Sequence, residues 1–216
     1  MASAPFAPLL REHLLDGLRV VLAGAPSHER DLTGKLGARI LELGGACATV
    51  EVRLDEDAES AEASAIADLA AAHRELGALD GIVIDGAALF SASPAEAALQ
   101  LAPAAIWNGA RAFANELIAA GRGGRIFILA PLPDGGEHAA AAVAGIENLA
   151  RTLSIEWARY GIATVAIAPG AQTGQAVLTE LMAYLLSPAG AYFSGCLLDL
   201  RGPAAVTATP IRPMPA

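Results

Sequence analysis

The chain has 216 residues, of which 54% are hydrophobic, and carries a formal net charge of −9. That length fits one domain with a sizeable core, and the acidic balance argues against nucleic acid or an anionic membrane surface as a partner. No apolar run reaches the roughly 20 residues that span a bilayer. Residues 1–21 lack a basic segment leading into an uninterrupted apolar stretch, so no signal peptide is predicted and we expect a cytoplasmic protein.

The residues that most often bind metals are few and scattered. Cys47 and Cys196 cannot form a disulfide framework and lack a CxxC spacing, so we expect small, buried side chains. The four histidines show no metal-ligand spacing among themselves; they are His13, His28, His73 and His138. No metal site is predicted.

In the first half of the chain, apolar runs rich in β-branched residues alternate with segments of helical periodicity. Leu36, Ile40 and Leu43 recur at helical spacing before a Gly44-Gly45 stop. The acidic residues early in the next helical segment match the helix dipole. The predicted strands cover residues 18–24, 46–54 and 79–87, and the predicted helices cover 32–45 and 55–77.

The second half continues the alternation. Ser93-Pro94 is typical of a helix start and predicts a helical stretch to Ala120, which Pro103 kinks or splits. Further strands are predicted at 124–130, 161–170 and 194–202, and further helices at 137–159 and 173–186. The proline-rich tail, residues 203–216, is expected to be extended.

Apolar strands that alternate with helices predict a parallel sheet with helices on both faces. The connections are short and no repeat is visible, so residues 1–216 are predicted to form a single doubly wound, Rossmann-like α/β domain with its core at about 17–202. Only one strand fits between Gly45 and the helix at 55–77. We therefore expect about six strands, with the second beside the first.

Seven stretches resemble the short-chain dehydrogenase/reductase family in order and approximate spacing, and cover most of residues 17–202. This resemblance implies a Rossmann-type sheet, NAD(P) at the carboxyl ends of the strands, and dimers or tetramers built on two long helices and the last strand. The stretches are Gly24 after the first strand, LDGIVIDGA (79–87), WNGARAF with Asn108, GRIFILA (124–130), NLARTLSIEWARYGI, VAIAPGAQTG and YFSGCLLDLRG.

The family's chemistry uses a tyrosine followed four residues later by a lysine, and this dyad is missing. The chain has a single lysine, Lys35, and none of its tyrosines, Tyr160, Tyr184 and Tyr192, has a lysine at that spacing. The resemblance places Ala139 at the tyrosine position, Val143 at the lysine position, and Ala130 and Pro131 at the serine position. Alanine and valine cannot transfer a proton. Asn108 matches the family's helix asparagine, although a local structural role is favoured.

The cofactor positions are also altered. Gly34 lies ten positions after Gly24. Pro26, Glu29 and Asp31 replace glycine there, and the two carboxylates add negative charge where phosphates would bind. Lys35 is expected in solvent, and Asp85 in a cap or turn. One helix–strand pair and most of the substrate lid are missing. NAD(P) binding is therefore expected to be lost, leaving vestigial positions at Gly24, Gly34, Gly86, Pro169 and Gly170.

We interpret the chain as a non-catalytic relative of this family with a structural role, which assembles with itself or with an active relative. The predicted contact uses the last strand and the helices at 95–120 and 137–160, the second of which is rich in small residues. Trp107 and Trp157 are expected in the core or an interface. One alternative is an active NAD(P)-dependent oxidoreductase that uses Tyr184 or Asp85, and another is a dinucleotide-sensing regulator. The predicted interface residues are Ala142, Gly145, Leu149 and Leu153.

Overall fold

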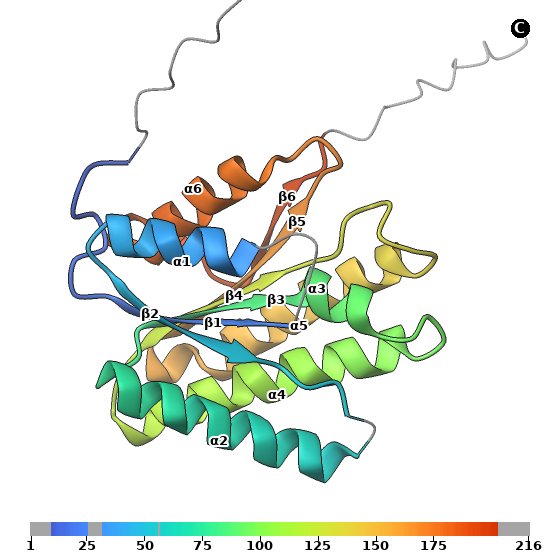
Figure 1. The fold of residues 1–216 in the computed structure, drawn as a ribbon, viewed down its shortest axis with the longest axis horizontal. Helices are drawn as coiled ribbons and strands as arrows, with labels where there is room; N and C mark the ends of the chain where they lie inside the picture. Colours follow the sequence, from blue (N-terminus) through green and yellow to red (C-terminus); the bar gives the residue numbers. More distant parts are fainter. Residues whose placement is uncertain (1–9, 26–31, 56, 203–216) are drawn as a thin grey trace, which may run out of the picture.

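A computed structural model describes residues 10–25, 32–55 and 57–202 and contains a six-stranded parallel sheet (Figure 1). The strand order is β2-β1-β3-β4-β5-β6. The predicted doubly wound α/β fold with about six parallel strands is confirmed. The strands are β1 (Arg19–Gly24), β2 (Ala46–Glu51), β3 (Gly81–Asp85), β4 (Gly124–Leu129), β5 (Ile162–Pro169) and β6 (Cys196–Leu200).

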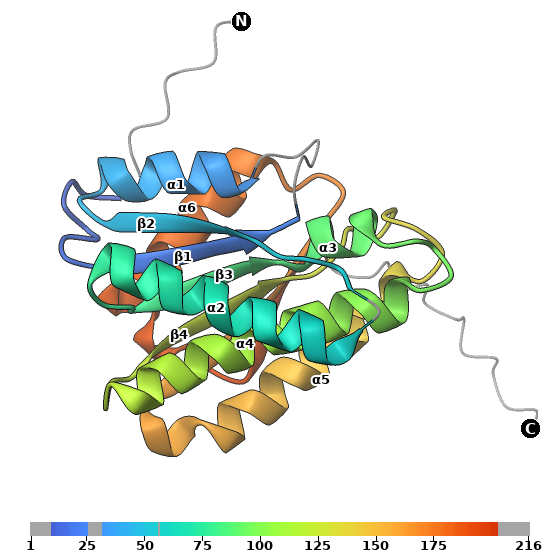
Figure 2. The same ribbon diagram turned by 60° about the horizontal axis from the view of Figure 1, so that its bottom comes forward.

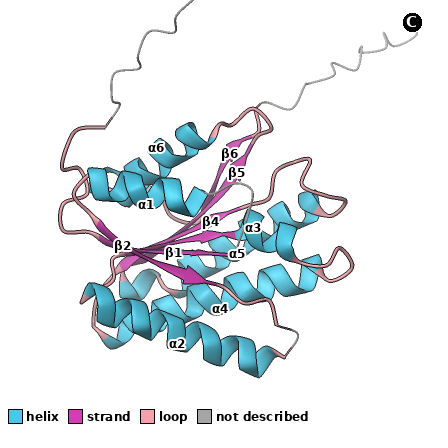
Figure 3. Ribbon diagram, in the orientation of Figure 1, coloured by secondary structure: helices cyan, strands magenta, loops and turns pink. Residues whose placement is uncertain are grey.

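Helices cover both faces of the sheet (Figures 2 and 3). On one face lie α1 (Leu32–Glu42) and α6 (Gln175–Leu186), which contact each other. On the other lie α2 (Ala58–Leu76), α4 (Ala98–Ala119) and α5 (Ala139–Glu156). The short helix α3 (Gly86–Ala92) follows β3 directly, and the 3-10 turns η1 (Ala158–Tyr160) and η2 (Pro188–Tyr192) follow α5 and α6.

The central strands are mostly apolar because their successive side chains enter two different cores. In β1, Val21 and Ala23 pack toward α2, α4 and α5, whereas Val20 and Leu22 pack toward α1 and α6. Phe127 of β4 belongs to the second core and is 1% exposed. The helical spacing predicted for α1 is confirmed, since Leu36, Ile40 and Leu43 are all buried there.

The strand β2 lies at one edge of the sheet and pairs in parallel with β1. In this register Arg19 lies opposite Ala46, and Gly24 lies opposite Glu51. The chain then returns through α2 to the far side of β1, where β3 pairs. No additional helix–strand pair separates β2 from β3 among the described residues, as predicted. The connection from β5 to β6 moves across the sheet in the same direction as the connections β2–β3, β3–β4 and β4–β5, but its helix, α6, lies on the opposite face. This crossover is therefore left-handed, an exception to the rule that crossovers between parallel strands are right-handed.

The sequence did not predict α3, and the strand expected at 79–87 was too long. The strand ends at Asp85, whose carboxylate accepts a hydrogen bond from the Ala88 amide at 2.9 Å and caps α3. Ser93 ends α3 instead of starting the next helix, since its amide donates to the carbonyl oxygens of Leu89 and Phe90. The following helix starts at Ala98 and continues through Pro103 without interruption.

Other predicted boundaries were too wide by a few residues. The helix expected at 137–159 ends at Glu156, and Gly161, with φ of 70°, turns the chain into β5. The helix expected at 173–186 begins at Gln175. The predicted extended tail, 203–216, lies outside the described residues. None of the described helices is long and apolar enough to span a membrane.

Candidate functional site

The carboxyl edge of the sheet is where open α/β folds bind ligands, at the point where the strand order reverses. Here that point lies between β1 and β3. Gly24 ends β1 and Asp85 ends β3 beside it. A Cβ added to Gly24 would meet Asp85 Cβ and Thr33 Cγ2, each at 3.5 Å, which is ordinary van der Waals contact. In the described part of the structure, Gly24 is therefore bordered by Asp85 and Thr33.

Asp85 places a carboxylate at this reversal point. The residue is 4% exposed, and its carboxylate caps α3 through the Ala88 amide. The cap suggested by the sequence is thus confirmed. A buried carboxylate here opposes the negative charge of a dinucleotide phosphate.

Two glycines at family cofactor positions are explained by the packing of the chain itself. A Cβ on Gly86 would lie 2.5 Å from the Leu129 carbonyl oxygen, and one on Gly170 would lie 2.6 Å from the Leu200 carbonyl oxygen. Pro169, the last residue of β5, is buried beside them. Gly34 lies in the first turn of α1, whereas Pro26, Glu29 and Asp31 lie outside the described residues.

The single lysine connects two helices. Lys35 Nζ donates to Oε1 of Gln175, which joins the first turn of α1 to the first turn of α6. One turn further along, Arg39 binds Glu180 with two hydrogen bonds of 2.7 and 3.3 Å. The pKa of Arg39 is raised, chiefly by the Glu180 carboxylate. These contacts fix α1 against α6.

The residues that the resemblance assigns to the family's catalytic positions lie in the apolar core. Ala130 is 0% exposed, Ala139 1% and Val143 4%, and Pro131 is also buried. Ala130, Ala139 and Val143 belong to the core between the sheet and the helices α2, α4 and α5. None of these side chains can donate or accept a proton.

Asn108 lies apart from those positions. The residue is half-buried on the flank of α4 that faces α2, where it lines a small groove with Ser64 and Asp68. Ala139 and Val143 lie on α5, and neither lines that groove. Nothing in this placement supports a catalytic role for Asn108.

Tyr184 was considered as an unconventional proton donor, and its position contradicts that role. The residue lies in the last turn of α6, two positions before Leu186, which contacts Gly81 at the start of β3. The amino edge of the sheet is the end opposite the dinucleotide edge. Tyr184 therefore lies at the wrong end of the sheet to serve a cofactor at Asp85.

The sequence did not indicate a cavity of about 460 Å³ beside α3, because α3 itself was not predicted. Its wall carries several polar side chains from the α3–α4 turn and the β4–α5 connection. The only sequence signal was the Glu137-His138 pair. The polar residues are Ser91, Ser93, Glu96, Glu137 and His138. No group of three potential metal ligands occurs in the described parts of the chain.

The predicted interface residues lie on different sides of α5. Ala142 and Leu153 are 5% and 2% exposed and pack in their own chain's core, so their side chains are not available to a partner. Leu149 is half-buried, whereas Gly145 is exposed, with nothing within 4 Å of an added Cβ. The correction arises because small residues also occur on the inward face of α5, where Ala139, Ala142 and Ala150 are buried.

Two tryptophans connect α4 to the end of α5. Trp107 of α4 and Trp157, just after α5, stack with ring centroids 6.2 Å apart and planes 15° apart. The Arg111 guanidinium lies 5.7 Å from the centroid of Trp107. Trp107 is still 38% exposed, and Ile155 of α5 is 77% exposed. An aromatic side chain of α4 and an aliphatic side chain near the end of α5 thus remain exposed.

No family model and no curated protein matches the chain. Among solved structures, a short chain dehydrogenase from Mycobacterium smegmatis has a TM-score of 0.72 at 18% identity, over 90% of this chain and 96% of that one. Hydroxysteroid dehydrogenase from Escherichia coli has a TM-score of 0.68 at 17% identity, over 89% and 99%. Acetoin dehydrogenase YohF from Salmonella typhimurium has a TM-score of 0.64 at 22% sequence identity, and the match covers 86% of each chain. The resemblance to short-chain dehydrogenases/reductases is confirmed at the level of the fold.

Proposed function

We propose that this protein is a non-catalytic relative of the short-chain dehydrogenases/reductases that acts as a structural subunit. One observation carries the proposal: Ala139 and Val143, at the positions of the family's proton-transferring dyad, are buried apolar side chains. A reductase of this type must deliver a proton to its substrate. These two positions can neither supply a proton nor contact a substrate from the core.

The carboxyl edge supports the loss of cofactor binding. Asp85 is a buried carboxylate at the reversal point of the sheet, and Gly86 and Gly170 are required by backbone packing. We expect NAD(H) and NADP(H) to bind with dissociation constants above about 1 mM, equivalent to less than about 4 kcal/mol of binding free energy.

The outward face of α5 supports an assembly role. Its small side chains permit close approach of another helix, and Ile155 adds exposed apolar area. We call Ala141, Ala144, Gly145, Asn148, Thr152 and Ile155 the α5 face. With Trp107 nearby on α4, this face suits a second copy of the chain or a catalytically intact relative.

The test combines three measurements on the purified protein. Light scattering should give the mass of an oligomer, calorimetric titration should give millimolar or weaker binding of both cofactors, and carbonyl reduction should be absent. Micromolar cofactor affinity without turnover would support a dinucleotide sensor instead. Turnover would support an active oxidoreductase with an unconventional donor and would overturn the proposal. A monomer that forms no complex with co-expressed intact relatives would overturn the structural role.

A further inference from the structure

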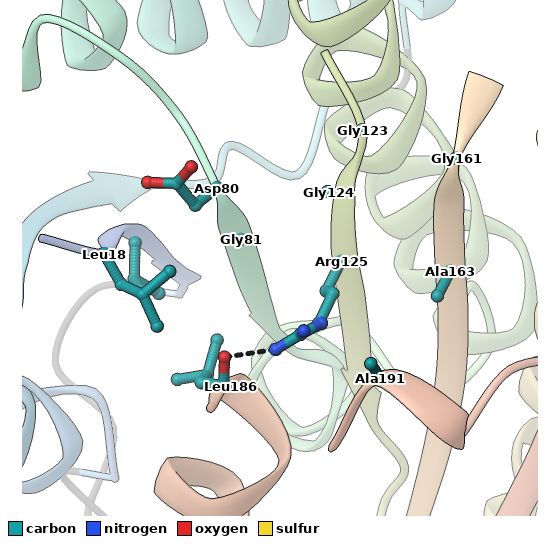
Figure 4. Close-up of a pocket in the computed structure, with 11 residues that line it drawn as sticks. Leu18, Asp80, Gly81, Gly123, Gly124, Arg125, Gly161, Ala163, Leu186 and Ala191 are labelled. Carbon is teal, nitrogen blue, oxygen red and sulfur yellow. Dashed lines mark hydrogen bonds between the residues drawn. The ribbon is translucent and has the colours of Figure 1, made fainter. Parts of the chain in front are cut away.

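A second cavity, of about 290 Å³, lies at the amino edge of the sheet, away from the family's cofactor edge. It is formed where β3, β4 and β5 begin, and the end of α6 and η2 border it. Leu18, Val20 and Leu186 contribute apolar side chains. Much of the remaining wall is backbone, because the other small lining residues are Gly81, Gly123, Gly124, Gly161, Ala163 and Ala191 (Figure 4).

Arg125 of β4 lines this cavity with its guanidinium (Figure 4). Its Nη1 donates to the carbonyl oxygens of Leu185, Leu186 and Ser187 at the end of α6, at 3.3 Å for Leu185 and 2.5 Å for Ser187. One nitrogen thus neutralises the carbonyl end of that helix. The guanidinium carries further N–H donors on Nε and Nη2.

Those further donors remain available. In the described chain, Nε and Nη2 of Arg125 donate to no protein acceptor. Among the described residues, the enclosed side-chain atoms without a hydrogen-bond partner are the hydroxyls of Thr164 and Thr179. Nε and Nη2 of Arg125 are not among them, so these nitrogens are not fully enclosed. Burial lowers the pKa of Arg125, because the charged guanidinium has lost part of its hydration. An anion in the cavity would replace that hydration.

The cavity wall also carries one carboxylate, Asp80, which is already paired. One of its oxygens accepts the Arg19 amide at 2.9 Å, and the other pairs with Arg122. Arg122 therefore offsets the charge of Asp80. Arg125 forms no ion pair of its own among the described residues, although Asp80 acts on its charge at longer range.

We infer that this cavity binds a small carboxylate, whose two oxygens accept from Nε and Nη2 of Arg125 and whose apolar body lies against Leu18, Val20 and Leu186. The planar guanidinium fork matches a carboxylate with two parallel hydrogen bonds. The volume is near the lower end of small-molecule pockets, which limits the ligand to a small organic acid. This site does not depend on the proposed structural role.

The probe is benzoate, and its binding to the full chain is measured by calorimetric titration. A parallel NMR titration follows the signal of the Arg125 Nε–H. We expect saturable binding, with a shift of that signal. Arg125→Gln should weaken binding at least about tenfold, since it removes charge-assisted hydrogen bonds. Because this change also removes the α6 contacts, Ala163→Leu provides a second variant that fills the cavity and keeps Arg125. It should weaken binding to a similar extent.

The controls are Arg74→Gln and Ala58→Leu, which make the same chemical changes at exposed positions on α2. Both should bind benzoate like the unaltered chain. The inference is overturned by a dissociation constant above about 10 mM for benzoate, or by unchanged binding in Ala163→Leu. Binding of inorganic phosphate but not benzoate would also overturn the assignment to a carboxylate.

Discussion

The Cα of Gly86 lies so close to the Leu129 carbonyl that an added Cβ would be 2.5 Å from the carbonyl oxygen. The same Cβ would lie 2.9 Å from Ile106 Cδ1. The glycine that follows Asp85 is therefore needed for β3, β4 and α4 to pack together. Its presence at a family cofactor position is accounted for without a cofactor.

We predict that Gly86→Ala lowers the free energy of unfolding by about 1–3 kcal/mol, because the methyl group forces the backbone of β4 or α3 to move. Gly109→Ala is the matched control. An added Cβ there would lie 3.7 Å from Ile84 Cδ1, which is ordinary van der Waals contact, and the residue is inside α4. The control should raise the free energy of unfolding by about 0.5–1 kcal/mol, since alanine is the better helix former. Urea unfolding measures both; equal effects would contradict the packing argument.

Restoring the family's dyad should damage the fold instead of creating activity. Val143→Lys places an ammonium group in an apolar core, and we expect it to lower the free energy of unfolding by about 2–4 kcal/mol. Ala140→Lys, at an exposed position on the same helix, should change it by less than about 0.5 kcal/mol. The double variant Ala139→Tyr with Val143→Lys should show no carbonyl reduction with NADH or NADPH. Measurable turnover would show that the cofactor edge is functional.

The α5 face can be tested by charge. Gly145→Glu and Ile155→Glu should each convert the oligomer to a monomer, because an unpaired charge buried between helices costs several kcal/mol. Leu41→Glu is the control, since Leu41 is 61% exposed on α1, on the other side of the sheet. Light scattering gives the mass in each case. If both α5 variants keep the mass of the unaltered chain, the contact lies elsewhere.

Asp199 should give a small, pH-dependent contribution to stability. Hydrogen bonds from Arg201 lower the pKa of this carboxyl to about 2, below its ordinary value of 3.8. A lowered folded-state pKa means that the stabilisation is present above about pH 4 and is lost as the pH falls toward 2. Because both partners are exposed, Asp199→Asn should cost less than about 1 kcal/mol at pH 7.

The measurement for Asp199 compares urea unfolding of the two proteins at pH 7 and pH 3, together with NMR titration of the carboxyl group. The difference between the proteins should shrink at the lower pH and in 1 M salt, where the pair is screened. A carboxyl that titrates near its ordinary value would contradict the role of Arg201.

The sequence alone predicted the sheet, and it shows that the family's Tyr-Lys spacing is absent. Strand and helix periodicity are local properties, so the alternation of elements and the position of β2 followed from them. A chain whose only lysine is Lys35 cannot contain the dyad in any arrangement. The short helix α3 was missed because its start depends on the Asp85 cap, and the apolar run into Gly86 resembles a continuing strand.

Only the tertiary structure decided which side chains are buried in the core and which are exposed to solvent or to a cavity. Periodicity shows that α5 has small residues on several sides, but only its contact with the sheet places Ala142 inward and Gly145 outward. The amino-edge cavity depends on contacts about 60 residues apart in sequence, where Arg125 reaches the end of α6. Composition and spacing carry no information about such contacts, because they form only when strand order and helix packing bring distant segments together.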